Sequence, residues 1–155
     1  MTSETLSQKE KELIAVACAV SAGCQRCCNY HFKKVFEVGA TLEEVQKSVE
    51  DAEAVIHHAD EMMQRHAYAL MEVSRDEVQL TAEALCRMTA LIKLGAAIAS
   101  NCTPTITVHL ALAKTSNATE GEIKVALKLG KMVLEKAGQF ANEAVNESLG
   151  IELLK

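Results

Sequence analysis

The pattern of apolar and polar residues in the first half of the chain recurs in the second half. When the sequence is shifted by 78 residues, segment 13–45 aligns without a gap with segment 91–123. The aligned positions that carry identical residues are Leu13, Ile14, Ala19, Cys24, His31, Ala40, Thr41 and Glu44. Because polar landmarks coincide as well as apolar ones, the pattern predicts a single domain, 1–155, built from a duplicated helical unit. Repeat 1 is expected over about 6–73 and repeat 2 over about 74–155.

Each unit is predicted to contain three helices, with a short break after the first and a turn after the second. Helix starts are marked by capping-box patterns, in which Ser or Thr precedes Glu by three residues, at Ser7, Thr41, Ser74 and Thr119. Gly39 and Asn117 stand where a helix would end in a left-handed residue. The pattern therefore predicts an all-α fold of roughly six or more helices without strands.

Pro104 places the cysteines of repeat 1 on their helix. Proline favours the first turn of a helix, and the equivalent of Pro104 in repeat 1 is Arg26. Cys24 is therefore expected near the N-cap, and Cys27 within the first turn. The unpaired backbone N–H groups and the positive end of the helix dipole at that place favour a thiolate.

Cys24, Cys27, Cys28 and His31 are spaced so that they share one stripe of this helix. Cysteines three residues apart on a helical turn lie within reach of a disulfide, so Cys24 and Cys27 can cycle between a dithiol and a disulfide. Cys28 is either a spare thiol or a buried bystander. His31, one turn beyond Cys27, is a candidate base.

Glu12 is the candidate partner of His31. If the chain folds back at Gly23, Glu12 lies about 16 Å down the first helix and His31 about 12 Å down the second, so the two are nearly level. This spacing favours a relay in which Glu12 holds His31 and His31 takes a proton from Cys27. We therefore predict a catalytic set of Glu12, Cys24, Cys27 and His31.

Repeat 2 lacks two members of this set. Glu12 corresponds to Ala90 and Cys27 to Thr105, so that only Cys102 and His109 remain. We predict one active and one degenerate site in each chain.

Composition and charge narrow the function classes. The chain is 49% hydrophobic, with one proline and no tryptophan, which is typical of a helical globular domain. A net charge of −5 without a basic stripe argues against nucleic-acid binding. The longest apolar run, 13–23, is too short to span a bilayer, and acidic residues precede it, so a cytoplasmic protein without a membrane partner is expected. There, clustered cysteines are more often catalytic or metal-binding than structural.

The motif Glu12-x11-Cys24-x2-Cys27-x3-His31, on an all-helical scaffold with an internal repeat, resembles the alkylhydroperoxidase D type (AhpD-like) of the carboxymuconolactone decarboxylase superfamily. The resemblance implies an antioxidant peroxidase or disulfide reductase that needs no cofactor beyond its cysteines and is reopened by an external dithiol or reductase. It also implies a homotrimer or homohexamer. Candidate partners are a peroxiredoxin and a dihydrolipoyl-type reductant. Arg26 stands where the best-known members have a histidine, and it cannot shuttle a proton.

Other interpretations stay open from the sequence. One alternative is a decarboxylase of the same superfamily, which would not need the dithiol. Another is a non-catalytic redox sensor or metal-binding protein, which would use the cysteines without catalysing a reaction. Zinc on Cys24, Cys27 and His31 would lack a fourth ligand. The segment 57–66, "HHADEMMQRH", could offer ligands, but a solvated helix face with its methionines packed inward is favoured. Core positions are expected for Cys18, Cys86 and Cys102.

Overall fold

The computed structural model describes residues 5–73, 85–150 and 152. Six helices are present in these segments, and no strand. They are α1 (Gln8–Ser21), α2 (Gln25–Glu37), α3 (Leu42–Leu70), α4 (Arg87–Ala99), α5 (Thr103–Thr115) and α6 (Glu120–Leu149). The predicted all-α fold is thereby confirmed.

The helix bounds follow the duplication. Helices α2 and α5 occupy the same 13 positions of their repeats, because 25–37 shifted by 78 gives 103–115. Helices α3 and α6 likewise begin at equivalent positions, 42 and 120. The predicted capping boxes at Ser7, Thr41 and Thr119 are present, and Gly39 and Asn117 have left-handed backbones. The pattern at Ser74 lies outside the described residues.

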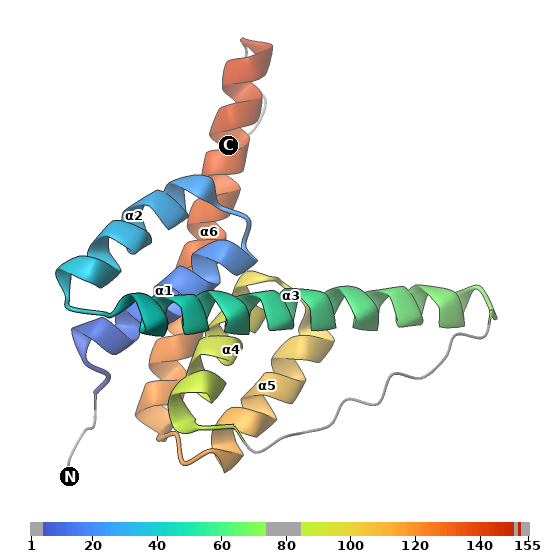
Figure 1. The fold of residues 1–155 in the computed structure, drawn as a ribbon. Coiled ribbons are helices and arrows are strands. Elements are labelled where there is room, and N and C mark those ends of the chain that lie inside the picture. Colours follow the sequence, from blue (N-terminus) through green and yellow to red (C-terminus); the bar gives the residue numbers. More distant parts are fainter. Residues whose placement is uncertain (1–4, 74–84, 151, 153–155) are drawn as a thin grey trace.

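The core lies where α1, α4 and α6 cross (Figure 1). Small residues permit this close approach. A Cβ atom added at Gly95 would lie 2.7 Å from Cγ2 of Ile14, and one added at Gly130 would lie 2.6 Å from the carbonyl oxygen of Gly95. Because such distances are shorter than real Cβ contacts, α4 can contact its two neighbours at this depth only if both positions are glycine.

The second helix of each repeat also contacts the third helix of the other repeat. Helix α2 packs against α6 of the other repeat, and α5 packs against α3 (Figure 1). The distal ends of α3 and α6 project from the core, and exposed apolar residues lie on them, among them Met63, Leu70, Met71, Val145 and Leu149. The expectation for the methionines of 57–66 is therefore half right: Met62 is partly buried, but Met63 is 48% exposed.

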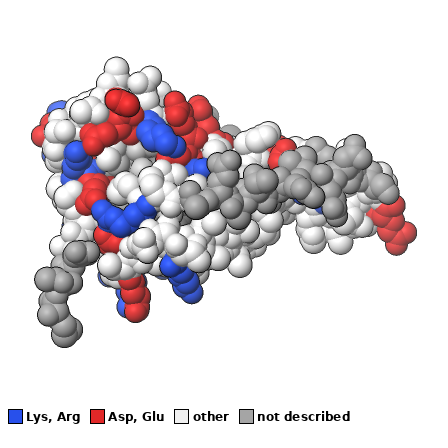
Figure 2. All heavy atoms as spheres, turned by 60° about the horizontal axis from the view of Figure 1, so that its bottom comes forward, with Lys and Arg blue, Asp and Glu red and all other residues white. Residues whose placement is uncertain are grey.

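The described surface in Figure 2 is mixed in charge, and the described helices are not of the membrane-spanning kind. On the face shown in Figure 2, basic and acidic side chains alternate, and the described part of that face carries no continuous basic patch. None of the described helices combines the length and the hydrophobicity that a membrane crossing requires.

Candidate active site

The turn between α1 and α2 places the cysteine pair. Gly23 has a φ of +63°, a left-handed conformation that glycine adopts without strain. In this turn the backbone N–H of Cys24 donates to the carbonyl of Ala19 at 3.1 Å, which closes the end of α1. Cys24 is then the N-cap of α2, as predicted, and its Sγ accepts a hydrogen bond from the backbone N–H of Cys27 at 3.2 Å.

Cys24 and Cys27 are joined as a disulfide, with their Cα atoms 5.2 Å apart. Both are buried, at 6% and 5% exposure. The pair therefore has the geometry that a dithiol–disulfide cycle requires, at the helix start where a thiolate is favoured.

His31, four residues after Cys27 on α2, forms a buried pair with Glu12 of α1. Nδ1 of His31 lies 2.9 Å from Oε2 of Glu12, and the side chains are only 11% and 12% exposed. An ionised Glu12 can only accept, so Nδ1 carries the proton and Nε2 is left as a free acceptor. The second carboxylate oxygen of Glu12 accepts a hydrogen bond from Nε2 of Gln8 at 3.2 Å. The structure thus brings together all four predicted site residues.

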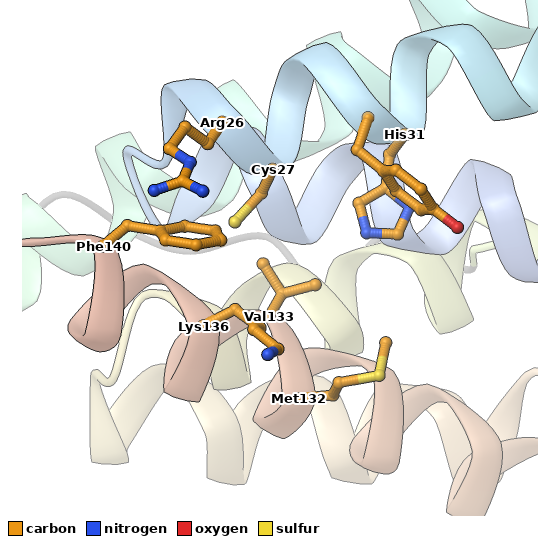
Figure 3. Close-up of a pocket in the computed structure, with 8 residues that line it drawn as sticks. Arg26, Cys27, His31, Met132, Val133, Lys136 and Phe140 are labelled. Atoms are coloured by element: carbon orange, nitrogen blue, oxygen red, sulfur yellow. The ribbon is translucent and has the colours of Figure 1, made fainter. Parts of the chain in front are cut away.

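A pocket of about 460 Å³ opens between α2 and α6. Cys27 and His31 line it from α2, whereas Cys24 is not among its lining residues. Figure 3 shows the opposite wall, where Met132, Val133 and Phe140 project from α6. Cys27 is therefore the sulfur that a molecule in the pocket would meet.

Arg26 and Tyr30 complete the α2 side of the pocket. The Arg26 guanidinium lies 3.8 Å from the ring centroid of Phe140 and forms a 2.6 Å ion pair with Glu143. These contacts tie the start of α2 to α6. Tyr30 packs edge-on against His31, with ring centroids 5.0 Å apart.

The equivalent position in repeat 2 has the same backbone conformation but lacks the second cysteine. The N-cap Cys102 has φ and ψ of −98° and 102°, against −100° and 96° for Cys24. Thr105 stands in place of the second cysteine, and its Oγ1 donates to Sγ of Cys102 at 3.0 Å. With only one thiol at this place, repeat 2 cannot form the disulfide that corresponds to Cys24–Cys27.

His109 of repeat 2 has no counterpart of Glu12 to hold it. It is 6% exposed, and neither ring nitrogen has a hydrogen-bond partner. Its ring packs edge-on against that of His58, 5.8 Å away between centroids. Burial, followed by the positive charges of His58 and Lys93, lowers the pKa of His109 to about 4. His109 is therefore neutral near pH 7.

The remaining cysteines differ in their surroundings. Cys18 and Cys102 are buried as expected, but Cys86 is exposed at the N-cap of α4, so its predicted core position is wrong. It lies at the start of a helix rather than inside one, and hydrogen bonds with Thr89 lower its pKa. Cys28 is partly buried against the core, and burial raises its pKa. Cys28 is therefore placed as a bystander to the pair.

The described residues contain no group of three or more His, Cys, Asp or Glu side chains placed to hold a metal ion. In the segment 57–66, His58 points to repeat 2 and pairs with His109, while His57 lies 3.4 Å from Glu61 on an exposed face. The segment therefore does not gather a ligand set.

Residues 1–70 match the model of the carboxymuconolactone decarboxylase family. The match covers the whole of α1, α2 and α3, and with them the Glu12, Cys24, Cys27 and His31 set. The predicted resemblance to this family is thereby confirmed. No curated protein and no solved structure matched the chain.

Sequence reasoning missed the α6 wall of the pocket and Gln8. Gln8 precedes Glu12 by four residues on one helix, a spacing that brings two side chains together and could have identified it. Nothing in the motif pointed to Met132, Val133 or Phe140, because they belong to the other repeat. They reach Cys27 because α6 of repeat 2 packs against α2 of repeat 1.

Proposed function

We propose that the protein is a thiol–disulfide oxidoreductase that reduces organic hydroperoxides, or the disulfide of a partner, with the Cys24–Cys27 pair. The observation that carries the proposal is the shared pocket of Cys27 and His31, behind which Glu12 holds His31 at 2.9 Å. A disulfide-forming pair that faced no pocket, or had no base beside it, would be merely a structural feature.

The proposed peroxide reduction starts from the dithiol. His31 accepts the proton of Cys27 at Nε2, and Glu12 stabilises the resulting imidazolium. The Cys27 thiolate attacks the terminal peroxide oxygen, so that an S–O bond forms while the O–O bond breaks. The leaving alkoxide takes the proton from His31, which yields an alcohol and a sulfenic acid on Cys27.

Cys24 then resolves the sulfenic acid. Its thiolate, at the N-terminus of α2, attacks the sulfur of Cys27 and releases hydroxide, which is protonated to water. The two electrons taken up by the peroxide have come from the two thiols, which end as the disulfide. An external dithiol, such as a dihydrolipoyl-type reductant, reopens it by two thiol–disulfide exchanges. Attack of Cys27 on a partner disulfide, such as that of a peroxiredoxin, would follow the same order.

Single-turnover trapping tests this mechanism. The reduced protein is mixed with one equivalent of cumene hydroperoxide and alkylated, and peptides are identified by mass spectrometry. We expect the wild type to form the Cys24–Cys27 disulfide, Cys24→Ser to stop at a sulfenic acid on Cys27, and Cys27→Ser to leave the peroxide unreacted. Cys28→Ser is the matched control and should behave as the wild type does. Peroxide consumption that survives Cys27→Ser would overturn the proposal.

A decarboxylase is the second candidate, because the matched family carries that activity in its name. Such a reaction would use the pocket without the dithiol. Decarboxylation of a muconolactone by the Cys24→Ser/Cys27→Ser double variant, without peroxide reduction by the wild type, would favour it over our proposal.

We further propose that the chain works as a homotrimer or homohexamer. The support is the exposed apolar surface on the projecting ends of α3 and α6, which a neighbouring copy would bury. Light scattering at micromolar concentration should give three or six times the mass of 16.8 kDa. A monomeric mass would contradict this assembly.

A further inference from the structure

The pocket beside Cys27 is mostly apolar, but it carries two cations. Met132, Val133 and Phe140 form the apolar wall, while Arg26 and Lys136 are the basic residues that line it. Its volume of about 460 Å³ exceeds by far what hydrogen peroxide needs, because a water molecule occupies only about 30 Å³ in the liquid. The space suits a molecule with an apolar body.

The two cations differ in what already neutralises them. Arg26 is paired with Glu143 at 2.6 Å and stacks on Phe140. Lys136 donates a long 3.4 Å hydrogen bond to the neutral amide oxygen of Gln139, and no carboxylate among the described residues lies within 4 Å of its ammonium. Of the two cations that line this pocket, Lys136 is therefore the one whose charge is not neutralised by a carboxylate of the described residues.

No carboxylate is among the residues that line the pocket, because Glu12 lies behind His31 and Glu143 pairs outside the lining. In a chain with a net charge of −5, this place is locally positive. A charge of one sign at a low-dielectric wall attracts an ion of the other sign.

The duplication shows which part of the pocket position 136 faces. Its counterpart in repeat 1 is His58, since 136 minus 78 is 58, and the counterpart of His31 in repeat 2 is His109. The rings of His58 and His109 are in contact. Because α2 packs on α6 as α5 packs on α3, position 136 lies on the His31 side of the pocket. Figure 3 shows Lys136 next to Val133 on the wall facing Cys27 and His31.

We propose that the pocket selects organic hydroperoxides that carry a carboxylate on an apolar body, and that Lys136 holds that carboxylate. The inference rests on the proposed peroxide reduction and adds the substrate class to it. The apolar wall holds the body, the ammonium of Lys136 pairs with the carboxylate, and the peroxide group is left to Cys27. Lys136 is thus a positioning residue that raises the occupancy of the pocket by anionic substrates.

The test compares cumene hydroperoxide with its para-carboxylated analogue, which has the same body and peroxide. The second-order rate constant of disulfide formation is measured for each by single turnover, in the wild type, Lys136→Gln and Lys131→Gln. Lys131 lies on the same helix and pairs with Glu135, away from the pocket lining, so it is the matched control. The carboxylated analogue should react faster with the wild type at low salt.

We expect Lys136→Gln to lower the preference, meaning the ratio of the two rate constants, about threefold to fivefold, the size of an exposed ion pair. Lys131→Gln should keep the ratio, and added salt should shrink it in the wild type. A wild type without preference, or a ratio unchanged by Lys136→Gln, would overturn the inference while peroxide reduction stood.

A binding measurement separates the two proposals. Calorimetry with the unreactive alcohol, 4-(2-hydroxypropan-2-yl)benzoate, should show binding that weakens about threefold to fivefold in Lys136→Gln. If neither peroxide oxidises the protein but this binding holds, the proposed reaction is wrong and the anion pocket is right. Oxidation by cumene hydroperoxide without any binding of the carboxylate would be the reverse result.

Discussion

Replacing Glu12 by glutamine tests the relay most directly. The amide keeps the size of the side chain and can still hydrogen-bond to His31, but it removes the negative charge that faces the ring at 2.9 Å. Both side chains are about nine-tenths buried, so water screens the pair little. A hydrogen bond to a charged group contributes about 1.5–3 kcal/mol. If this stabilisation is expressed when His31 takes the proton of Cys27, its loss slows the reaction roughly 10- to 150-fold.

The assay is single-turnover formation of the Cys24–Cys27 disulfide with cumene hydroperoxide at neutral pH. Glu10→Gln is the matched control, because it removes a carboxylate from the same helix, where Glu10 pairs with Arg87 at 2.8 Å instead of with His31. It should cost stability but leave the rate unchanged. A Glu12→Gln protein that is folded by circular dichroism and reacts within twofold of the wild-type rate would refute the relay.

Three further predictions concern repeat 2 and the core. Thr105→Cys should form a second disulfide with Cys102, detectable in non-reduced peptide maps, because the backbone there matches that of the first pair; free thiols at both positions after oxidation would contradict it. Because the pKa of His109 falls from about 6.5 in the unfolded chain to about 4 in the fold, the unfolded state binds the proton first as the pH drops. His109 should therefore lower the free energy of unfolding by up to about 1.4 kcal/mol for each pH unit as the pH falls from about 6.5 to about 4. In urea unfolding, the free energy of unfolding of His109→Leu should fall less steeply than that of the wild type over this pH range. An equally steep fall in both proteins would refute this. Gly130→Ala should destabilise by about 1–3 kcal/mol in urea unfolding, whereas Gly138→Ala on the same helix, where a Cβ meets nothing within 4 Å, should be neutral or stabilising.

Local signals predicted the helices well. The capping boxes at Thr41 and Thr119, and the left-handed Gly39 and Asn117, depend on hydrogen bonds between residues close in sequence, which a sequence displays directly. The placement of Cys24 at an N-cap followed from Pro104 through the duplication. These features needed no knowledge of how the helices pack.

The contact between Glu12 and His31 could be predicted because, in a helical hairpin, the distance of each residue from the turn sets which residues of the two helices lie side by side. Once Gly23 reverses the chain, the rise of a helix sets which residues lie level, and this places Glu12 beside His31. The pocket could not be predicted in this way. Phe140 and Lys136 approach Cys27 only because α6 packs against α2, and neither capping nor periodicity encodes that pairing.

The wrong prediction of a core position for Cys86 shows that burial also depends on how the helices pack. Leu85 and Met88, which flank it closely in the sequence, are apolar, but a residue at a helix start is buried only if another element covers that end. In the same way, Met63 follows Met62 directly, yet the sulfur of Met62 lies 3.8 Å from Oγ1 of Thr105 in the other repeat, whereas Met63 is 48% exposed. Adjacent residues on a helix face directions about 100° apart, so composition alone cannot assign both to the core.

The contact between α2 of repeat 1 and α6 of repeat 2 limits how the chain can be divided. Residues 1–70, where the family match lies, contain Glu12, Cys24, Cys27 and His31, yet they form only one of the two walls of the pocket. The other wall is supplied by a repeat whose own site lacks a dithiol. An isolated first half would therefore leave Cys27 and His31 without the Met132, Val133 and Phe140 wall that encloses them in the full chain.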